Sequence, residues 1–99
     1  MKAVQITDVK NIEIIDTCEP KLKENHAEIS VKAMGICGSD VHAYAGKSPN
    51  VTYPVIIGHE TAGIVTKIAE GSNLHNIKIG DRVVLNPYIY CGHCYPCSL

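Results

Sequence analysis

Alternation of apolar and polar residues with period two is the feature that most constrains the fold of this chain. It recurs in five runs: KAVQITD, NIEIID, HAEISVKAM, TAGIVTKIAE and IKIGDRVVL. Successive side chains of a strand point to opposite faces, so this pattern is typical of half-buried antiparallel strands. Turn residues separate the runs at Glu19-Pro20, at residues 70–73 and at residues 79–81. The pattern predicts a mainly β fold, either a barrel or a sandwich.

Helical patterns are scarce in the sequence. Residues 39–45 form the one helix candidate, in which Ser39 or Asp40 could cap the first turn. From Pro87 onward the alternation stops, and we expect a Pro/Cys/Gly-rich loop. The sequence contains no G-x-G-x-x-G fingerprint, no Walker loop and no βαβ alternation. We therefore expect that no dinucleotide-binding domain lies within these 99 residues.

Composition excludes several classes of partner. A net charge of −1 gives no long-range attraction to nucleic acid, and five tyrosines without Phe or Trp offer no base-stacking platform. No apolar run approaches the ~18 residues that cross a bilayer, and the first residues lack the apolar segment of a secretory signal. Five cysteines in such a chain indicate a reducing cytoplasm, where thiols serve metals or catalysis. We interpret Cys18, His26 and His75 as structural residues.

The strongest chemical motif is CGHCYPCSL, residues 91–99, in which Cys91, Cys94 and Cys97 are three residues apart. Thiolates at this spacing on an irregular loop can converge on one soft cation. Zinc is one candidate, and an iron–sulfur cluster is the other, because C-x2-C-x2-C also begins the bacterial ferredoxin motif. Either site needs a further ligand beyond Leu99. His93 is a poor substitute, since it adjoins Cys94 and adjacent residues rarely chelate one tetrahedral ion.

A second donor set combines Cys37 with the tripeptide Gly58-His59-Glu60. A thiolate, an imidazole and a carboxylate suit Zn²⁺, and three protein ligands would leave a fourth position for water or substrate. Spacing alone leaves another interpretation open. Cys37 could be a small buried apolar residue, and His59 and Glu60 could be an ordinary exposed pair.

Four segments occur in a specific order: GICGSDVHAYAG, YPVIIGHETAGIV, IKIGDRVVLNP and CGHCYPC. Together they resemble the N-terminal part of the zinc-dependent medium-chain dehydrogenases, the superfamily of alcohol, polyol and threonine dehydrogenases. The resemblance covers essentially the whole chain. It implies a GroES-like distorted antiparallel barrel, partial within these residues, with a Cys-rich zinc-binding loop at the C-terminal end.

The resemblance implies two zinc sites. The residues that match the catalytic zinc ligands are Cys37, His59 and Glu60. The residues that match three of the four structural zinc ligands are Cys91, Cys94 and Cys97. The fourth cysteine of the family lies a few residues further on, so residues 86–99 are expected to be the first part of that loop.

Further residues near Cys37 match positions around the catalytic zinc. Asp40 matches the carboxylate that orients the zinc-binding histidine, a role with a clear physical basis. Ser39 matches the hydroxyl of a proton relay, and His42 matches its outer member. Gly38 stands where classical alcohol dehydrogenases often carry a basic residue, and GICGSD is more like the polyol and threonine branches.

We therefore expect residues 1–99 to be the N-terminal segment of the catalytic domain of a zinc- and NAD(P)-dependent alcohol or polyol dehydrogenase. The Rossmann domain is expected outside the chain, and the isolated segment is expected to be inactive. The whole enzyme would be a cytoplasmic homodimer or homotetramer that acts on a small alcohol. Two alternatives remain, an iron–sulfur electron carrier and a stand-alone metal-binding module without catalysis.

Overall fold

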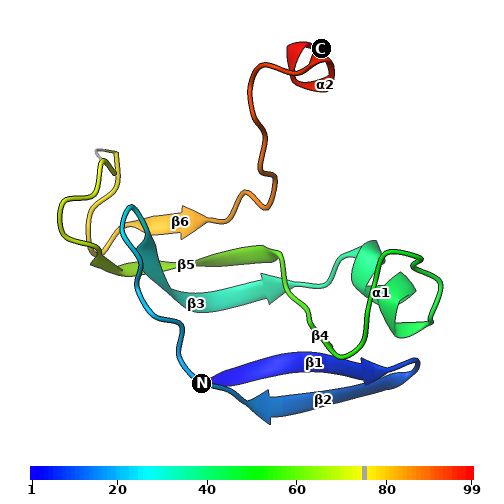
Figure 1. The fold of residues 1–99 in the computed structure, drawn as a ribbon. Helices are drawn as coiled ribbons and strands as arrows, with labels where there is room; N and C mark the ends of the chain where they lie inside the picture. The colour runs from blue at the N-terminus through cyan, green and yellow to red at the C-terminus, as the bar shows by residue number, and fades with distance from the viewer. Residues whose placement is uncertain (75) are drawn as a thin grey trace.

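The computed structural model describes residues 1–74 and 76–99, so His75 lies outside the described residues. Two three-stranded antiparallel sheets make up most of the fold. The strands are, in spatial order, β2 (Asn11–Asp16), β1 (Lys2–Asp8) and β4 (Val55–Ile56) in one sheet, and β3 (Ala27–Gly35), β5 (Glu60–Ile68) and β6 (Arg82–Val84) in the other. Figure 1 shows the two sheets one above the other, with helix α1 (Gly38–Tyr44) at one end. The prediction of a mainly β fold is confirmed. In the same ranges, no helix combines the length and apolar character needed to cross a membrane.

The first sheet is built on a hairpin that matches two of the predicted runs residue for residue. Strands β1 (Lys2–Asp8) and β2 (Asn11–Asp16) pair antiparallel, with Lys2 opposite Asp16. At the turn, Lys10 adopts a positive φ of 57°. The short strand β4 (Val55–Ile56) pairs with the other edge of β1. It was not predicted, because two residues are too few to show a period.

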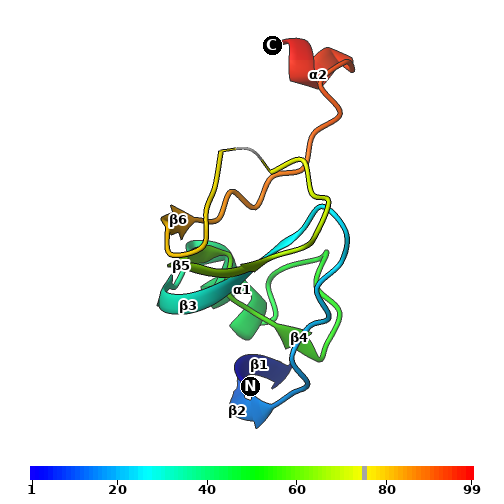
Figure 2. The same ribbon diagram turned by 90° about the vertical axis from the view of Figure 1, so that its left-hand side faces the viewer.

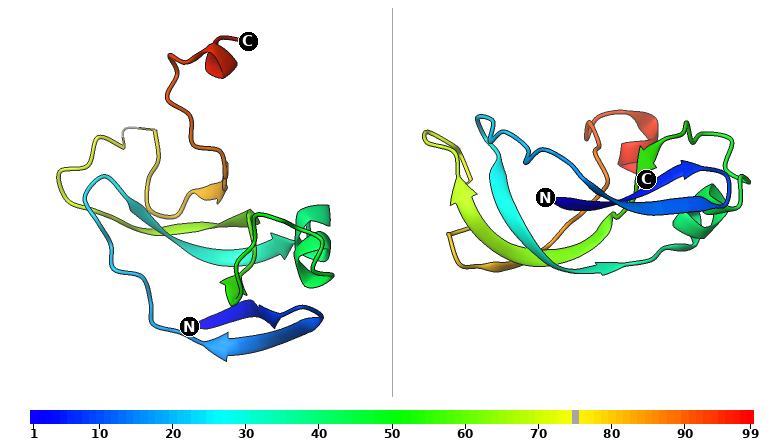
Figure 3. Two further views of the ribbon diagram at one scale, coloured as in Figure 1. Left: turned by 45° about the vertical axis from the view of Figure 1, so that its right-hand side comes forward. Right: turned by 90° about the horizontal axis from the view of Figure 1, so that it is seen from below.

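The second sheet is centred on the pairing of β3 (Ala27–Gly35) with β5 (Glu60–Ile68). Two irregularities interrupt the register, one between Glu28 and Ile29 and one between Val31 and Ala33. Such bulges bend and twist a strand, and the curvature of β3 and β5 is visible from below in Figure 3. The curvature allows this sheet to arch over the first one.

The run IKIGDRVVL is the largest departure from the predicted strands. Only Arg82–Val84 form a strand, β6, which pairs with β5. The preceding residues form a turn instead. The Asp81 side chain accepts a hydrogen bond from the Lys78 amide at 2.8 Å, and Gly80 has a φ of 95°. Aspartate favours turns because its side chain accepts hydrogen bonds from nearby backbone amides, and glycine because it adopts a positive φ without steric cost. Here these preferences outweigh the alternation of apolar and polar residues.

The predicted helix exists, but its cap is different. Cys37, with extended backbone angles, is the N-cap of α1, and neither Ser39 nor Asp40 is. Asp40 nevertheless stabilises this end, because its carboxylate accepts a hydrogen bond from the Cys37 amide. A single turn, α2 (Tyr95–Ser98), was also missed within the predicted C-terminal loop.

The apolar core within residues 1–74 and 76–99 is small and consists of Ile6, Ala43 and Val65. The inner faces of the two sheets line a cavity of about 780 Å³. Figure 2 shows, edge-on, that the sheets do not close on each other and that the segment after β6 leads away from both. The result is an open, partial barrel with α1 packed at one end.

We predict that Gly63→Ala weakens the pairing of β3 with β5. An added Cβ would lie 2.4 Å from the Ser30 carbonyl oxygen and 2.6 Å from the Ile29 side chain. Overpacking of this kind costs about 1 to 3 kcal/mol of unfolding free energy, measurable by urea denaturation. Gly38→Ala is the matched control, since its Cβ would meet no atom within 4 Å. Equal stability of the two variants would contradict the prediction.

Candidate metal centres

The register of β3 and β5 brings the first donor set together. The last residue of β3, Gly35, pairs with the first residue of β5, Glu60. Cys37 follows two residues after β3, and His59 immediately precedes β5. A Cβ at Gly35 would lie 2.8 Å from a Glu60 carboxylate oxygen, so the glycine leaves room for that side chain. Residues more than twenty positions apart in sequence therefore meet at one end of the second sheet.

The ligand atoms of Cys37, His59 and Glu60 all lie within 4.8 Å of one another. These residues line a cleft of about 430 Å³, whose opposite wall includes Val84, Leu85, Pro87 and Tyr88. The structure thus brings together three residues that spacing alone left uncertain. The mixed sulfur, nitrogen and oxygen donors suit Zn²⁺ and leave room for a further ligand from the cleft.

Asp40 connects the two halves of this cluster. Its side chain is largely buried, with a relative exposure of 9%. One carboxylate oxygen, Oδ2, accepts the hydrogen bond from the Cys37 amide at 3.0 Å, and the other, Oδ1, lies 3.7 Å from His59 Nδ1. A carboxylate beside Nδ1 favours a proton on that nitrogen and leaves Nε2 free as a ligand.

The two ligands on either side of Asp40 also alter each other's protonation. The Ser39 hydroxyl, the Ser39 amide and His59, in decreasing order, lower the pKa of the Cys37 thiol, while burial and the charge of Glu60 oppose them. The hydrogen bond with Cys37 raises the pKa of His59 above 6.5. Partial burial opposes that rise in the pKa of His59, and the charges of Asp40, Cys37 and Glu60 add to it.

The two predicted relay residues lie on the exposed surface of α1. Ser39 belongs to the first turn, and its hydroxyl interacts with the Cys37 sulfur. His42 follows three residues later, so the two side chains lie on neighbouring positions of one helix face. The arrangement places a hydroxyl beside the metal-ligand cluster and a histidine about one helical turn further along α1.

The second donor set is the group of three thiols in the C-terminal segment. The sulfur of Cys97 lies 3.3 Å from that of Cys94 and 3.8 Å from that of Cys91. All three residues are exposed. The amide of His93, followed by the Cys94 thiol, lowers the pKa of Cys91 to about 7.

The donor chemistry of both groups fits zinc. Four-coordinate zinc with bonds of about 2.3 Å to sulfur places neighbouring sulfurs about 3.8 Å apart, close to the observed Cys91–Cys97 separation. The thiol group supplies three ligands of the all-sulfur kind found in structural sites. The group beside the cleft supplies three mixed ligands of the kind found in catalytic sites.

Comparison with known proteins identifies the fold family. Residues 23–99 match the family model of the alcohol dehydrogenase GroES-like domain. The chain belongs to this family. The match confirms the resemblance to the zinc-dependent medium-chain dehydrogenases and the GroES-like fold.

Relatives match the chain along its length. It is 42% identical over 99 residues to an uncharacterized zinc-type alcohol dehydrogenase-like protein of Haemophilus influenzae, covering 100% of this chain and 29% of that protein. It is 39% identical over 101 residues to sorbitol dehydrogenase of Bacillus subtilis, covering 99% of this chain and 28% of that protein. A crystal structure of an alcohol dehydrogenase, rspB, of Escherichia coli CFT073 with NADH superposes with a TM-score of 0.82 at 39% identity. That superposition covers 99% of this chain and 28% of the other, so this GroES-like domain spans less than a third of the relatives it matches.

The sequence did not predict the structural role of several residues that shape the site. Gly35 makes room for Glu60, and Gly58, with a φ of 114°, turns the chain just before His59. A Cβ at Gly58 would lie 2.0 Å from the Met34 sulfur. The glycine beside His59 was a signal for a special backbone position. The cleft wall at Leu85 and Tyr88 had no sequence signal, because it depends on where the chain leads after β6.

We predict that Cys37→Ala lowers the pKa of His59 in the chelator-treated chain. The hydrogen bond with Cys37 is the largest cause of the raised pKa, and partial burial, which remains, acts in the opposite direction. The imidazole should therefore lose its proton at lower pH, as measured by NMR titration of its ring resonances. Asp40→Asn should lower the pKa of His59 by a smaller amount, and the His26 resonances serve as the internal reference. An unchanged His59 titration in Cys37→Ala would contradict this geometry.

Proposed function

We propose that residues 1–99 form the N-terminal part of the catalytic domain of a zinc-dependent alcohol or polyol dehydrogenase. The observation that supports it most is the cluster of Cys37, His59 and Glu60 beside a cleft, held by the carboxylate of Asp40. The cluster occurs in a member of the alcohol dehydrogenase GroES-like domain family. The reaction is oxidation of a primary or secondary alcohol, with hydride transfer to NAD(P).

In this proposal Cys37, His59 and Glu60 would hold the catalytic zinc. When bound, zinc supplies Lewis acidity that lowers the pKa of a substrate hydroxyl. Asp40 fixes the ring of His59 and the amide of Cys37, so that the ligands are in place before substrate arrives. Glu60 is exposed at the start of β5, whereas His59 is half-buried there.

We assign the movement of the substrate proton to the surface of α1. Ser39 is the residue next to the cluster with a hydroxyl that can accept and donate a proton in one step. His42, exposed on the same face, can pass that proton to solvent. The apolar side chains of Val84 and Leu85 line the cleft beside the cluster.

A polyol is the substrate class we favour. Gly38 stands where a basic residue is common in classical alcohol dehydrogenases, and one relative of this chain is a sorbitol dehydrogenase. NAD(P) is the proposed hydride acceptor, since a structural relative was solved with NADH. The relatives are more than three times as long as this chain. We propose that the dinucleotide-binding domain lies outside residues 1–99 and that these residues alone do not turn over.

The three C-terminal thiols are proposed as ligands of a structural zinc, with residues 86–99 as the first part of the loop and a fourth ligand beyond Leu99. The family favours zinc over the iron–sulfur alternative for this spacing. All five cysteines are free thiols, which supports a reducing, cytoplasmic location. For the whole enzyme we propose a homodimer or homotetramer.

We predict that the chain binds Co²⁺ as a zinc substitute at the cluster beside the cleft. Cys37→Ala should abolish this site, and Asp40→Asn should weaken it by about 10- to 100-fold, because the carboxylate orients the imidazole. Equilibrium dialysis and the sulfur-to-cobalt absorption band measure both effects in a background with Cys91, Cys94 and Cys97 replaced by serine, which removes the thiols of the other group. Cys18→Ala is the control, since this exposed thiol belongs to neither cluster. Retention of the site in Cys37→Ala would exclude the proposed ligand set.

We predict that, in the protein encoded by the complete gene, Ser39→Ala lowers kcat for polyol oxidation by about 100- to 10,000-fold, the usual range for a lost proton-transfer group. Zinc content should stay unchanged, because Ser39 is not a ligand. Val41→Ala, an exposed substitution on the same helix, is the matched control. The assay follows NAD(P) reduction by its absorbance at about 340 nm. It is run at near-neutral pH, where histidine can transfer protons. Full activity in Ser39→Ala would exclude this route for the proton.

A further inference from the structure

The C-terminal segment carries a second chemical property, which is independent of catalysis. Within the Cys-rich segment, Cys94-Tyr95-Pro96-Cys97 is a Cys-x-x-Cys sequence with proline before the second cysteine. Its two sulfurs lie 3.3 Å apart, closer than the 3.8 Å between Cys91 and Cys97. They are also closer than the about 3.8 Å expected for two sulfurs on one tetrahedral zinc. The sulfur of Cys97 is therefore nearer to Cys94 than to Cys91.

The backbone explains why this pair is close. Cys94 is the N-cap of α2 and has an extended conformation, with φ −84° and ψ 165°. Cys97 lies in the turn that follows, and the Ser98 amide donates a hydrogen bond to the Cys94 carbonyl at 3.2 Å. Pro96, near the start of α2, restricts the backbone between the two cysteines. The turn thus holds both side chains on the same side before any covalent bond forms.

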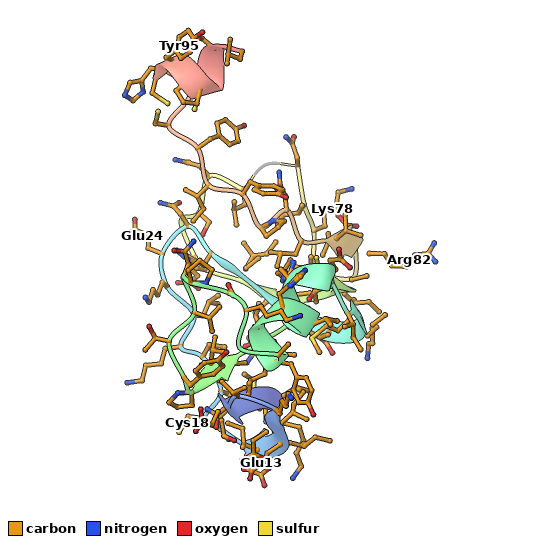
Figure 4. The ribbon with its side chains drawn as sticks, turned by 90° about the vertical axis from the view of Figure 1, so that its right-hand side faces the viewer. Glu13, Cys18, Glu24, Lys78, Arg82 and Tyr95 are labelled. Atoms are coloured by element: carbon orange, nitrogen blue, oxygen red, sulfur yellow. The ribbon has the colours of Figure 1, made fainter. Side chains whose placement is uncertain are left out.

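The surroundings leave the pair accessible. Cys94 and Cys97 are exposed, and residues 86–99 contain no acidic or basic side chain other than His93. Figure 4 shows α2, marked by Tyr95, at the far end of the molecule from Cys18 and Glu13. No residue of this segment beyond Tyr88 lines the cleft beside Cys37. An oxidant can reach the pair without entering the catalytic cleft.

We propose that Cys94 and Cys97 form an oxidant-sensitive dithiol that closes to a disulfide with peroxides. One thiolate attacks a peroxide oxygen, the O–O bond breaks, and a sulfenic acid and water form. The second sulfur then attacks the sulfenic sulfur, the S–O bond breaks, and a second water leaves. The two thiols lose two electrons and two protons, and the peroxide is reduced to two waters. A disulfide sulfur is not a thiolate ligand, so closure and zinc binding in this loop exclude each other.

The test uses the whole 99-residue chain, freed of metal by chelation, with hydrogen peroxide as the probe. Trypsin cleavage after Arg82 releases residues 83–99, which contain the three loop cysteines but neither Cys18 nor Cys37. After alkylation of remaining thiols, mass spectrometry of this peptide reports closure as the loss of two hydrogen atoms. Cys91→Ser leaves only the proposed pair in the peptide. Cys94→Ser and Cys97→Ser each remove one member of it.

Cys91→Ser should close at least about tenfold faster than either other variant, because the attacking and receiving sulfurs are already adjacent. Equal closure rates in Cys91→Ser and Cys94→Ser would overturn the proposal, and so would conversion of the pair to sulfinic acids without a disulfide. These serine substitutions lie in an exposed segment, so loss of folding does not obscure the comparison.

A second arm separates this proposal from the structural zinc site. Preincubation of the unsubstituted chain with one equivalent of Zn²⁺ should slow closure at least about tenfold, since bound thiolates are less available for attack. Closure in Cys91→Ser without protection by zinc in the unsubstituted chain would contradict the zinc site and support the dithiol. Protection by zinc without closure in metal-free Cys91→Ser would contradict the dithiol and support the zinc site.

Discussion

The antiparallel pairing of β3 with β5 is the interaction on which the rest of this structure depends. Its register sets Gly35 opposite Glu60, and so it brings the chain that enters Cys37 beside the chain that leaves His59. Gly63 allows this pairing, because any side chain there would collide with the Ser30 carbonyl of the neighbouring strand. In a domain with few buried apolar side chains, strand pairing determines the geometry of the site more than a large core does.

Asp40 links the backbone positions set by the sheet to the side chains of the cluster. Burial of a carboxylate is costly unless hydrogen-bond donors or positive charge compensate it. Here one carboxylate oxygen of Asp40 accepts a hydrogen bond from the Cys37 amide, and the other faces the ring of His59. The beginning of α1 and the beginning of β5 are therefore held by one side chain. These contacts stabilise α1, which has only seven residues, because short helices have marginal stability without tertiary contacts.

The two cysteine-containing clusters differ in the way expected for two different roles. Cys37 shares its site with an imidazole and a carboxylate, at the wall of a cleft large enough for a small alcohol. Cys91, Cys94 and Cys97 form an all-sulfur group, exposed and distant from that cleft. Mixed donors with an open position suit activation of a bound oxygen, whereas an all-sulfur site suits a structural ion. The exposed thiols also meet the requirements for oxidation more closely than Cys37 does.

Local pattern was enough to predict β1, β2 and most of β3 and β5, because period-two alternation reflects which face of a strand is buried. It was also enough to predict the group of three C-terminal thiols, whose spacing along the chain is short. It failed at residues 77–81, where Asp81 and Gly80 make a turn, and at the cap of α1. Neither pattern nor spacing could bring Cys37 to His59, since that contact requires two distant segments to pair in one register. Tertiary structure alone decided it, and with it the position of the cleft.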